Sequence, residues 1–312
     1  MARALRITFP GAFYHVTSRG NERKQVFKTK RDREKFLEYL ESATQRYDAL
    51  IHAYCLMDTH YHLLLETPSG NLSQIMRHIN GAYTTYFNEK RARSGHLFQG
   101  RYKAILVDID EYGKELSRYI HLNPVRAKIV ETPEEYDWSS YKFYIGKQKP
   151  AEWLYRDFIL SYFGKNASTA QKAYQRFVNA LVNRKYNSPL DDVVSSTLLG
   201  SPDCIASIKD KYLSGKKPDK ELPALKELSQ KPSTQDIFDE VEAIFSKEKA
   251  LARNIKMYLC QRYTGERLKD IGSHFGIGES GVSQASRRAA QRIEKDKKLK
   301  KKIDKIIKKL NV

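Results

Sequence analysis

The hydrophobic pattern of the first 125 residues switches repeatedly between the period of a strand and the period of a helix. Residues 12–19 alternate apolar and polar side chains, which predicts a β-strand. Phe36, Leu37 and Leu40 recur at helical spacing in the segment that follows. The same criteria predict strands over 12–19, 50–57, 60–67 and 102–109, and helices over 31–47, 72–90 and 110–122. Pro124 is expected to stop the last of these helices.

The order strand-helix-strand-strand-helix-strand-helix predicts an α+β fold. It matches the split βαβ pattern of ferredoxin-like domains, an antiparallel sheet with helices on one face. We expect this domain to span residues 1–145. Residues 146–233 show no further strand pattern and contain several prolines among charged residues, which indicates a helical connector with a poorly ordered stretch. Residues 234–312 have helical periodicity throughout and predict a second, all-α domain.

The amino-acid composition indicates what kind of partner the chain binds. The chain of 312 residues has a formal net charge of +19, and its 20 Tyr and 13 Phe accompany 56 Lys and Arg. Cations interleaved with aromatic rings suit phosphates and stacked bases, so we expect nucleic acid as the partner. The three cysteines have no spacing typical of zinc or disulfide motifs, and the chain contains no long apolar run. We therefore expect a soluble cytoplasmic protein, associated with the nucleoid and not with a membrane.

The first candidate site residues are the two histidines of the segment His60-Tyr61-His62. Alternate side chains of a strand share a face, so the two imidazoles are expected to lie side by side, as metal ligands often do. Leu63 to Leu65 exclude the His-x-His-x-Asp-His type of metallo-hydrolase. A cupin metal site would use Glu66, but cupins are all-β and this chain has long helical patterns. A nuclease with two histidines holding a divalent cation over a phosphodiester remains as a third alternative.

Two residues of the helix predicted after the fourth strand support the nuclease alternative. Tyr119 and Asn123 are four residues apart and therefore share a helix face. A tyrosine phenol can attack phosphorus and remain covalently attached, and an amide oxygen can complete a site for a hard cation. The simpler interpretation is that Tyr119 is a core aromatic and that Asn123 only ends the helix before Pro124.

Four segments, in order, carry a resemblance to a known family. They are Phe13-Tyr-His-Val-Thr-Ser-Arg-Gly-Asn21, Leu56-Met-Asp-Thr-His-Tyr-His-Leu-Leu-Leu-Glu66, Leu97-Phe-Gln-Gly-Arg-Tyr-Lys103 and Tyr119-Ile-His-Leu-Asn-Pro-Val-Arg-Ala127. Over about the first 145 residues the chain resembles the single-tyrosine HUH transposases, and within them the REP-associated tyrosine transposases. Tyr61 stands where the family has its bulky hydrophobic residue.

The resemblance implies roles for individual residues. His60 and His62 match the metal-binding pair. Tyr119 matches the nucleophile that forms a 5′-phosphotyrosine link to single-stranded DNA and leaves a free 3′-hydroxyl. Asn123 matches the third ligand, which is often Gln in mobile members. The resemblance further implies Mg²⁺ or Mn²⁺, cleavage without ATP, and recognition of DNA hairpins with flanking single strands. His121 lies between Tyr119 and Asn123 and points elsewhere on the predicted helix, so we expect it to be structural or to contact DNA and not to be a ligand.

Further basic and polar residues lie where they could grip phosphates beside this site. They fall in two groups, at the end of the first strand with its following loop, and at the start of the fourth strand: Arg19, Asn21, Arg23 and Lys24, then Arg101 and Lys103. The alternative for each is an ordinary solvated loop residue.

A second candidate DNA-binding element lies between residues 268 and 289. The sequence predicts a helix-turn-helix with its turn at Gly276 and Gly278 and a helix capped by Ser280. Val282, Ala285 and Ala289 would face inward; the outward face would present base- and phosphate-contacting types, Ser283, Gln284, Arg287 and Arg288. Residues 252–292 resemble the duplex-binding C-terminal domain of the bacterial initiator DnaA, although the turn is shorter. The basic amphipathic segment 295–310 suits extra DNA contact, pairing with another helix, or a solvated amphipathic end.

The sequence thus predicts a metal-dependent tyrosine transposase, an endonuclease and strand transferase, with a duplex-binding accessory domain. The principal alternative is a DNA-binding regulator on an inactive nuclease fold. A replication initiator of the same superfamily is a third interpretation, but the sequence contains no Gly-x-x-x-x-Gly-Lys-Ser/Thr helicase motif. Either a monomer or a homodimer is compatible with the resemblance.

Overall fold

The computed structural model describes residues 5–182, 184, 186–213 and 232–310. Internal contacts divide these residues into two units. We call residues Arg6–Val193 with Thr197–Gly200 the sheet unit. The helical unit holds Leu5, Val194–Ser196, 201–213 and 232–310. No helix of the described chain is long and apolar enough to cross a bilayer.

A five-stranded sheet forms the centre of the sheet unit, in the order β2-β3-β1-β4-β5. The strands are β1 (Ala12–Arg19), β2 (Leu50–Met57), β3 (His60–Thr67), β4 (Lys103–Val107) and β5 (Leu198–Leu199). The first four strands pair antiparallel with one another, as predicted, and their order β2-β3-β1-β4 is that of a ferredoxin-like domain. The short β5 makes the complete sheet mixed, because it runs parallel to β4. The predicted α+β fold, with an all-helical region after it, is therefore confirmed.

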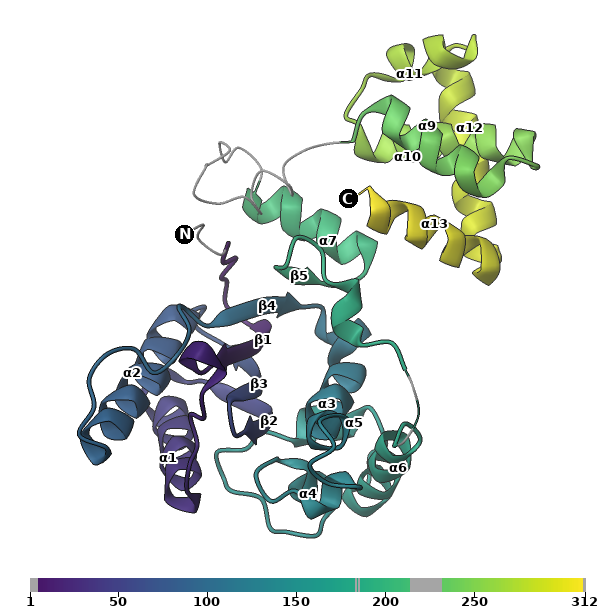
Figure 1. Cartoon of the computed structure of the whole chain (residues 1–312). Helices are drawn as coiled ribbons and strands as arrows, with labels where there is room; N and C mark the ends of the chain where they lie inside the picture. Colours follow the sequence, from purple (N-terminus) through teal and green to yellow (C-terminus); the bar gives the residue numbers. More distant parts are fainter. Residues whose placement is uncertain (1–4, 183, 185, 214–231, 311–312) are drawn as a thin grey trace. The chain divides into compact units, whose positions relative to one another are not determined.

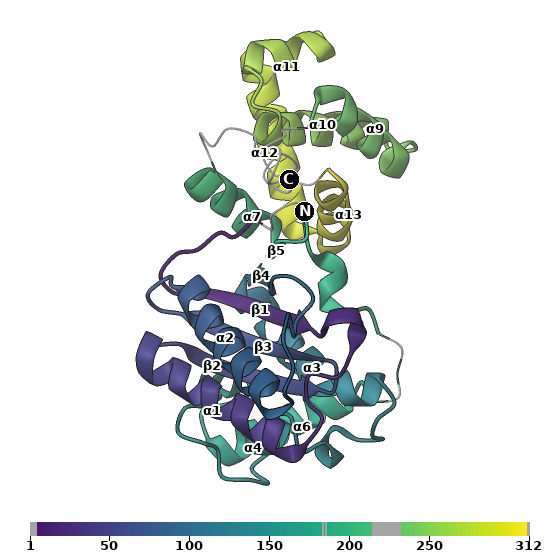
Figure 2. The same ribbon diagram turned by 60° about the vertical axis from the view of Figure 1, so that its left-hand side comes forward.

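The long helices of this unit are α1 (Lys30–Tyr47), α2 (Leu72–Lys90) and α3 (Ile109–Arg126). The α1 and α2 helices pack on one face of the sheet, where Tyr61 contacts Phe36 and donates a hydrogen bond to Asn80. Since His62 follows Tyr61 in the strand, it points to the opposite face. There it meets Tyr119 of α3. Figures 1 and 2 show α3 across the sheet from α1 and α2. The expectation of helices on one face was wrong.

The start of α1 and the end of α2 are tied together by the buried carboxylate of Asp32. Thr29 and Asp32 form a reciprocal capping box at the first turn of α1. The same carboxylate accepts a 2.9 Å hydrogen bond from Lys90 and pairs with Arg91. Burial by itself would raise the pKa of Asp32, but the hydrogen bonds from Lys90, the Lys28 backbone N–H and Arg91 outweigh it and lower the pKa to about 2.

The helix α3 does not stop before Pro124 but includes it and ends at Arg126. Proline removes one N–H donor from the helix, and its ring clashes with the preceding turn. Two helical residues nevertheless follow Pro124 in this helix. The backbone N–H of Ile129 then donates to the Pro124 carbonyl and closes the end. The prediction that Pro124 stops the helix was therefore wrong by one short turn, which is the turn that carries Arg126.

The chain beyond residue 145 belongs to the sheet unit as far as Val193. The short helices of the whole sheet unit are α4 (Tyr141–Tyr144), α5 (Asp157–Ser161), α6 (Ala167–Asn179) and the 3-10 segments η1 (Asn21–Arg23), η2 (Pro133–Glu135) and η3 (Pro189–Asp192). The segment before α4 covers the free edge of β2, through hydrogen bonds from Leu56 N–H to Trp138 and from Ser140 N–H to Tyr54. The predicted boundary at residue 145 falls inside this unit.

The sheet unit also contains a strand where none was predicted. Leu198 and Leu199 form β5, which pairs parallel with β4 through Leu106 and Val107. A strand of two residues is too short to show an alternating pattern, so the expectation that strands end near residue 145 was wrong. Part of the predicted poorly ordered stretch, residues 214–231, lies outside the described residues.

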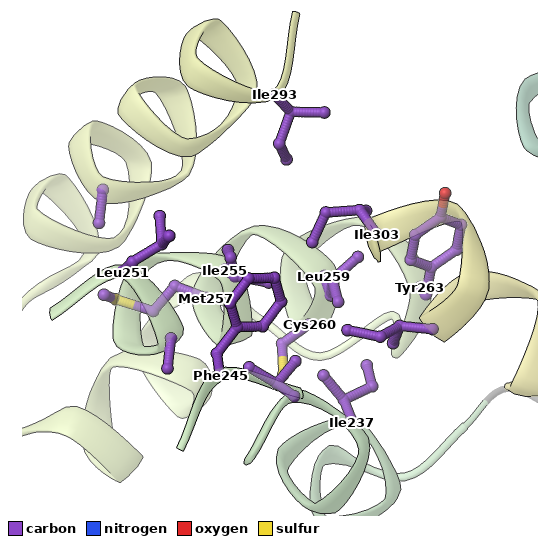
Figure 3. Packing of buried hydrophobic residues seen from close by; sticks show 14 of the residues in the cluster. Ile237, Phe245, Leu251, Ile255, Met257, Leu259, Cys260, Tyr263, Ile293 and Ile303 are labelled. Atoms are coloured by element: carbon purple, nitrogen blue, oxygen red, sulfur yellow. The ribbon is translucent and has the colours of Figure 1, made fainter. Parts of the chain in front are cut away.

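The helical unit is built from α7 (Pro202–Ile208), a π-helical turn η4 (Lys209–Leu213), α9 (Thr234–Phe245), α10 (Lys249–Tyr263), α11 (Leu268–Phe275), α12 (Glu279–Lys295) and α13 (Lys297–Lys309). Its core gathers around α10, which packs on α9 and α12 (Figure 3). The apolar stripe of α13, including Leu299, Ile303 and Ile306, is buried in this core. The basic tail therefore pairs with other helices, which was one of its three expected roles.

The turn between α11 and α12 is closed by backbone contact. Gly276 adopts φ +64°, and the N–H of Ile277 donates to the Gly272 carbonyl. A Cβ on Gly272 would lie 2.3 Å from the Ile277 carbonyl oxygen, so only glycine permits this approach. The cap of α12 is Gly278 and not the predicted Ser280, because the helix already begins at Glu279.

Candidate active site

The two histidines of β3 lie side by side on the face of the sheet that α3 covers. Their ring centroids are 5.0 Å apart, and Tyr61 between them points to the other face. Nδ1 of His60 lies 3.0 Å from the Thr59 hydroxyl, so its Nε2 atom is the one that remains for a ligand. The expected pairing of the two imidazoles is therefore present.

A third imidazole, which the sequence patterns did not single out, lies against this pair. His15 of β1 places its Nε2 atom 2.9 Å from Nδ1 of His62, with the two rings within 6° of parallel. Both side chains are buried. The buried Nε2 atom of His62 has no hydrogen-bond partner among the described residues. A buried nitrogen without a partner costs free energy, and a cation ligand would remove that cost.

All three imidazoles are held in the neutral form. Burial lowers the pKa of His15 to about 3. Burial, with a smaller effect of the Arg19 charge, lowers the pKa of His60 to about 4. The pKa of His62 is held well below its usual value by burial and by repulsion from His15 and His60. Neutral imidazole is the form that binds metals, so these residues could act as ligands at neutral pH.

The helix α3 brings Tyr119 to the histidines. The half-buried Tyr119 ring meets the His62 ring edge to face, with centroids 5.8 Å apart, and meets His15 in the same way at 6.0 Å. One turn later the amide nitrogen of Asn123 donates a 2.9 Å hydrogen bond to the Tyr119 carbonyl. Because the nitrogen is engaged, the amide oxygen of Asn123 is the atom available to a cation.

These residues fit a divalent cation only as part of a larger ligand set. Two neutral imidazoles and one amide oxygen are ordinary ligands, and His62 has a buried nitrogen to offer. Among the described residues, no group of three or more His, Cys, Asp or Glu side chains is arranged to hold a metal. A cation here would need further ligands from water or from a phosphate. Glu66, the cupin candidate, is instead paired with His52 at 2.9 Å.

Two predicted phosphate contacts lie on the same face as the histidines. Arg19 is directly opposite His60 in the β1–β3 register. Lys103 is opposite Thr17, which in turn is opposite His62. Directly opposed residues share a face of the sheet, and both basic side chains are exposed. Arg101, two residues before β4 begins, is also exposed.

The loop after β1 is held in a fixed turn. Its backbone is anchored by Gly20 N–H to Thr59 and by Asn21 N–H to Leu97. A Cβ on Gly20 would lie 2.1 Å from the Lys24 carbonyl oxygen, so glycine is required here. The predicted contact residues Asn21, Arg23 and Lys24 are all exposed, with Lys24 in a 2.6 Å ion pair with Glu22.

A basic residue beside Tyr119 also escaped the sequence prediction. The guanidinium carbon of Arg126, an exposed residue, lies 4.8 Å from the centroid of the Tyr119 ring. Its signal in the sequence is the spacing of Tyr119, Asn123 and Arg126, which places them on one helix face. For His15 the signal is a single histidine in the apolar strand segment Phe13-Tyr-His-Val.

His121, which precedes Asn123 by two residues, has a structural role. Its Nδ1 atom lies 2.7 Å from the Tyr174 hydroxyl and its Nε2 atom 2.7 Å from the Ser140 hydroxyl. The side chain is buried and both nitrogens are engaged. It is therefore not available as a metal ligand or a DNA contact.

The outward face of α12 agrees with the sequence prediction. Val282, Ala285 and Ala289 are buried. The four predicted DNA contacts are exposed: Ser283, Gln284, Arg287 and Arg288.

Residues 8–123 match the family model described as "Transposase IS200 like". The matched segment is less than half of the chain, and it contains His15, His60, His62, Tyr119 and Asn123. The match supports a transposase function, acting on DNA, for the sheet unit.

Among solved structures, the chain is similar to one titled "Structure of the REP associates tyrosine transposase bound to a REP hairpin". The two share 17% sequence identity with a TM-score of 0.41, over 47% of this chain and 87% of that chain. No curated protein matches the chain significantly.

Proposed function

We propose that the sheet unit is a metal-dependent endonuclease and strand transferase that cuts single-stranded DNA near hairpins, with Tyr119 as its nucleophile. The observation that carries the proposal is the position of the Tyr119 ring, edge-on to His62 at 5.8 Å, on the helix face that also carries Asn123. The family match and the four sequence segments support the same chemistry. The hairpin preference rests on the sequence resemblance.

The reaction would proceed through a covalent protein–DNA intermediate. The Tyr119 phenol oxygen attacks the scissile phosphorus and loses its proton, a phosphorus–oxygen bond forms, and the bond to the 3′-oxygen breaks. That oxygen gains a proton and leaves as a free 3′-hydroxyl. Attack by another 3′-hydroxyl reverses the exchange and joins a new strand. A bound Mg²⁺ or Mn²⁺ would polarise the phosphate and offset the charge that builds up on it.

His60, His62 and Asn123 would hold the cation, and His15 would position one of them. A cation on Nε2 of His62 requires the proton on Nδ1, and Nδ1 then donates to Nε2 of His15. The hydrogen bond fixes both the tautomer and the ring orientation. His15 is thus a positioning residue and not a ligand.

The proposed DNA path begins at the residues around the histidines. Arg19 and Lys103 on the sheet face, with Arg101 and the loop residues Asn21, Arg23 and Lys24, would bind phosphates of the single strand. In the helical unit, the α11–α12 pair would act as a DnaA-like helix-turn-helix on duplex DNA. Its contacts would be Ser283, Gln284, Arg287 and Arg288.

Covalent adduct formation tests this proposal. A labelled hairpin oligonucleotide with single-stranded flanks is incubated with the full chain and Mg²⁺ or Mn²⁺, and adducts are separated on a denaturing gel. We expect an adduct with the native chain and a phosphate on the peptide that contains Tyr119. Because Tyr119→Phe removes the attacking oxygen, it should form adducts more slowly by on the order of 1,000-fold or more. Tyr112→Phe is the matched control, since its hydroxyl lies on the same helix and contacts Asp192.

The outcome that contradicts the assignment is an undiminished adduct in Tyr119→Phe. Duplex binding without cleavage under any divalent cation would instead favour the alternative function, a DNA-binding regulator on an inactive nuclease fold.

A further inference from the structure

A hollow of about 500 Å³ opens beside the end of α3. It is lined by Arg126, Arg184, Tyr186 and Asn187. The residues that line it therefore carry two guanidinium groups, one phenol ring and one amide. All four residues lie outside the segment that matches the transposase family model, which ends at residue 123. The volume is within the range of sites that hold one small organic ligand.

Arg126 connects this hollow to the candidate nucleophile. Its guanidinium carbon is 4.8 Å from the Tyr119 ring centroid and 5.4 Å from the Tyr186 ring centroid. The two rings thus both lie against one cation. Whatever the hollow binds would lie next to the atoms that react under the proposed function.

The lining has the chemistry of a nucleotide site. A guanidinium group offers a fork of N–H donors that matches phosphate oxygens, and it can make two hydrogen bonds to one phosphate. A phenol ring supplies a face on which a base can stack, whatever its sequence. The amide of Asn187 offers both a donor and an acceptor for a base edge.

We propose that this hollow binds the nucleotide next to the scissile phosphate of the single-stranded substrate. Arg126 and Arg184 pair with its phosphates, and its base stacks on Tyr186. The inference rests on the proposed function for the location of the scissile phosphate, and it adds a subsite for the flanking strand.

The test uses the full chain and hairpin oligonucleotides in which 2-aminopurine replaces one base at a time along the single-stranded flanks. Stacking on an aromatic ring quenches 2-aminopurine fluorescence, so binding is read without any cleavage. We expect one position to be quenched by the native chain and by Tyr186→Phe, but not by Tyr186→Ala. Tyr155→Ala is the matched control, because Tyr155 is an aromatic residue of the same unit that is 49% exposed.

Abasic substitution gives the second arm. At the quenched position, removing the base is expected to weaken binding by roughly 5- to 150-fold in the native chain, the range for one base–aromatic stack. The same removal should have little effect in Tyr186→Ala, which no longer has the stack. In Arg126→Gln, binding should weaken and its salt dependence should become shallower, while Trp fluorescence reports an intact fold.

Two results would overturn the proposal. One is the absence of a position whose quenching depends on Tyr186. The other is an abasic effect that is equal in the native chain and Tyr186→Ala at every position. Either result leaves the adduct assay of Tyr119→Phe unaffected, and a negative adduct assay leaves the fluorescence measurement intact. The subsite and the nuclease assignment can therefore fail separately.

Discussion

Replacing His15 with leucine would show whether the third imidazole controls metal binding at the histidine pair. The 2.9 Å contact with His15 is the hydrogen bond that the His62 ring makes within the described chain, and both residues are buried. Without it, Nδ1 of His62 would have no partner, and neither the tautomer nor the ring angle would be fixed. The Nε2 atom would then be presented to a cation in a mixture of states.

The expected size of the effect follows from the role of such partners in metal sites. Loss of a hydrogen-bond partner to a ligating histidine weakens metal binding by roughly 10- to 100-fold, which is about 1.4 to 2.8 kcal/mol. His15→Gln retains an amide oxygen that can accept from Nδ1, so it should recover much of this affinity. Leaving one buried nitrogen unpaired should also lower the free energy of unfolding by about 1–3 kcal/mol.

The assay is Mn²⁺ titration by electron paramagnetic resonance, with hairpin DNA present and Tyr119→Phe as the background that prevents cleavage. Both tryptophans, Trp138 and Trp153, lie in the sheet unit, so their fluorescence reports folding of that unit. The control is His121→Leu, which removes an equally buried imidazole with two hydrogen bonds. It should destabilise the unit but leave Mn²⁺ affinity unchanged. If a folded His15→Leu chain binds Mn²⁺ as tightly as its parent, His15 does not position the ligand.

Three other predictions concern stability and duplex binding. Asp32 has a pKa of about 2 in the native state, below its ordinary 3.8, so its stabilising contribution is complete above about pH 4 and disappears as pH falls through 2. Asp32→Asn should remove that part of the pH dependence. It should also lower the free energy of unfolding by about 2–3 kcal/mol at pH 7, because the charged hydrogen bonds from the partly exposed Lys90 and Arg91 are lost; tryptophan fluorescence during urea unfolding measures both. Gly272→Ala should destabilise the helical unit by about 1–3 kcal/mol through a backbone clash. Gly281→Ala is the control, because its new Cβ would meet only the side chain of Ile277 and should not destabilise the unit. Circular dichroism on heating compares the two variants, and equal melting temperatures would contradict the clash. Arg287→Gln and Arg288→Gln should each reduce the slope of log K against log salt concentration for duplex binding by about 0.9 for each phosphate that the variant no longer neutralises. Fluorescence anisotropy at several salt concentrations measures this slope. An unchanged slope in both variants would show that α12 is not part of the duplex interface.

Much of the sheet could be predicted because its elements carry their own periodic patterns. The predicted bounds of β1, β2, β3 and α2 coincide with those of the structure. In α2 the apolar residues at steps of four are buried, whereas β2 and β3 are apolar for most of their length and are buried on both faces. The strand β5 could not be found in the same way, since two residues contain no period and its pairing with β4 joins segments about 90 residues apart.

The candidate site was predictable only in part, for a related reason. His60, His62, Tyr119 and Asn123 lie in short segments whose spacing already indicates a shared face. His15 and His62 are 47 residues apart, and only the β1–β3 register brings their nitrogens together. Arg126 escaped prediction because a proline ordinarily ends a helix, although α3 extends through Pro124 to Arg126.

The position of α3 on its own sheet has a consequence for stoichiometry. Tyr119 approaches the histidines of the same polypeptide, so one molecule would supply the proposed nucleophile and the proposed cation ligands together. Under the proposed function, cleavage would scale with the first power of enzyme concentration. Mixing chains that lack Tyr119 with chains that lack His62 would then yield no complementation, because neither population could lend its missing part to the other.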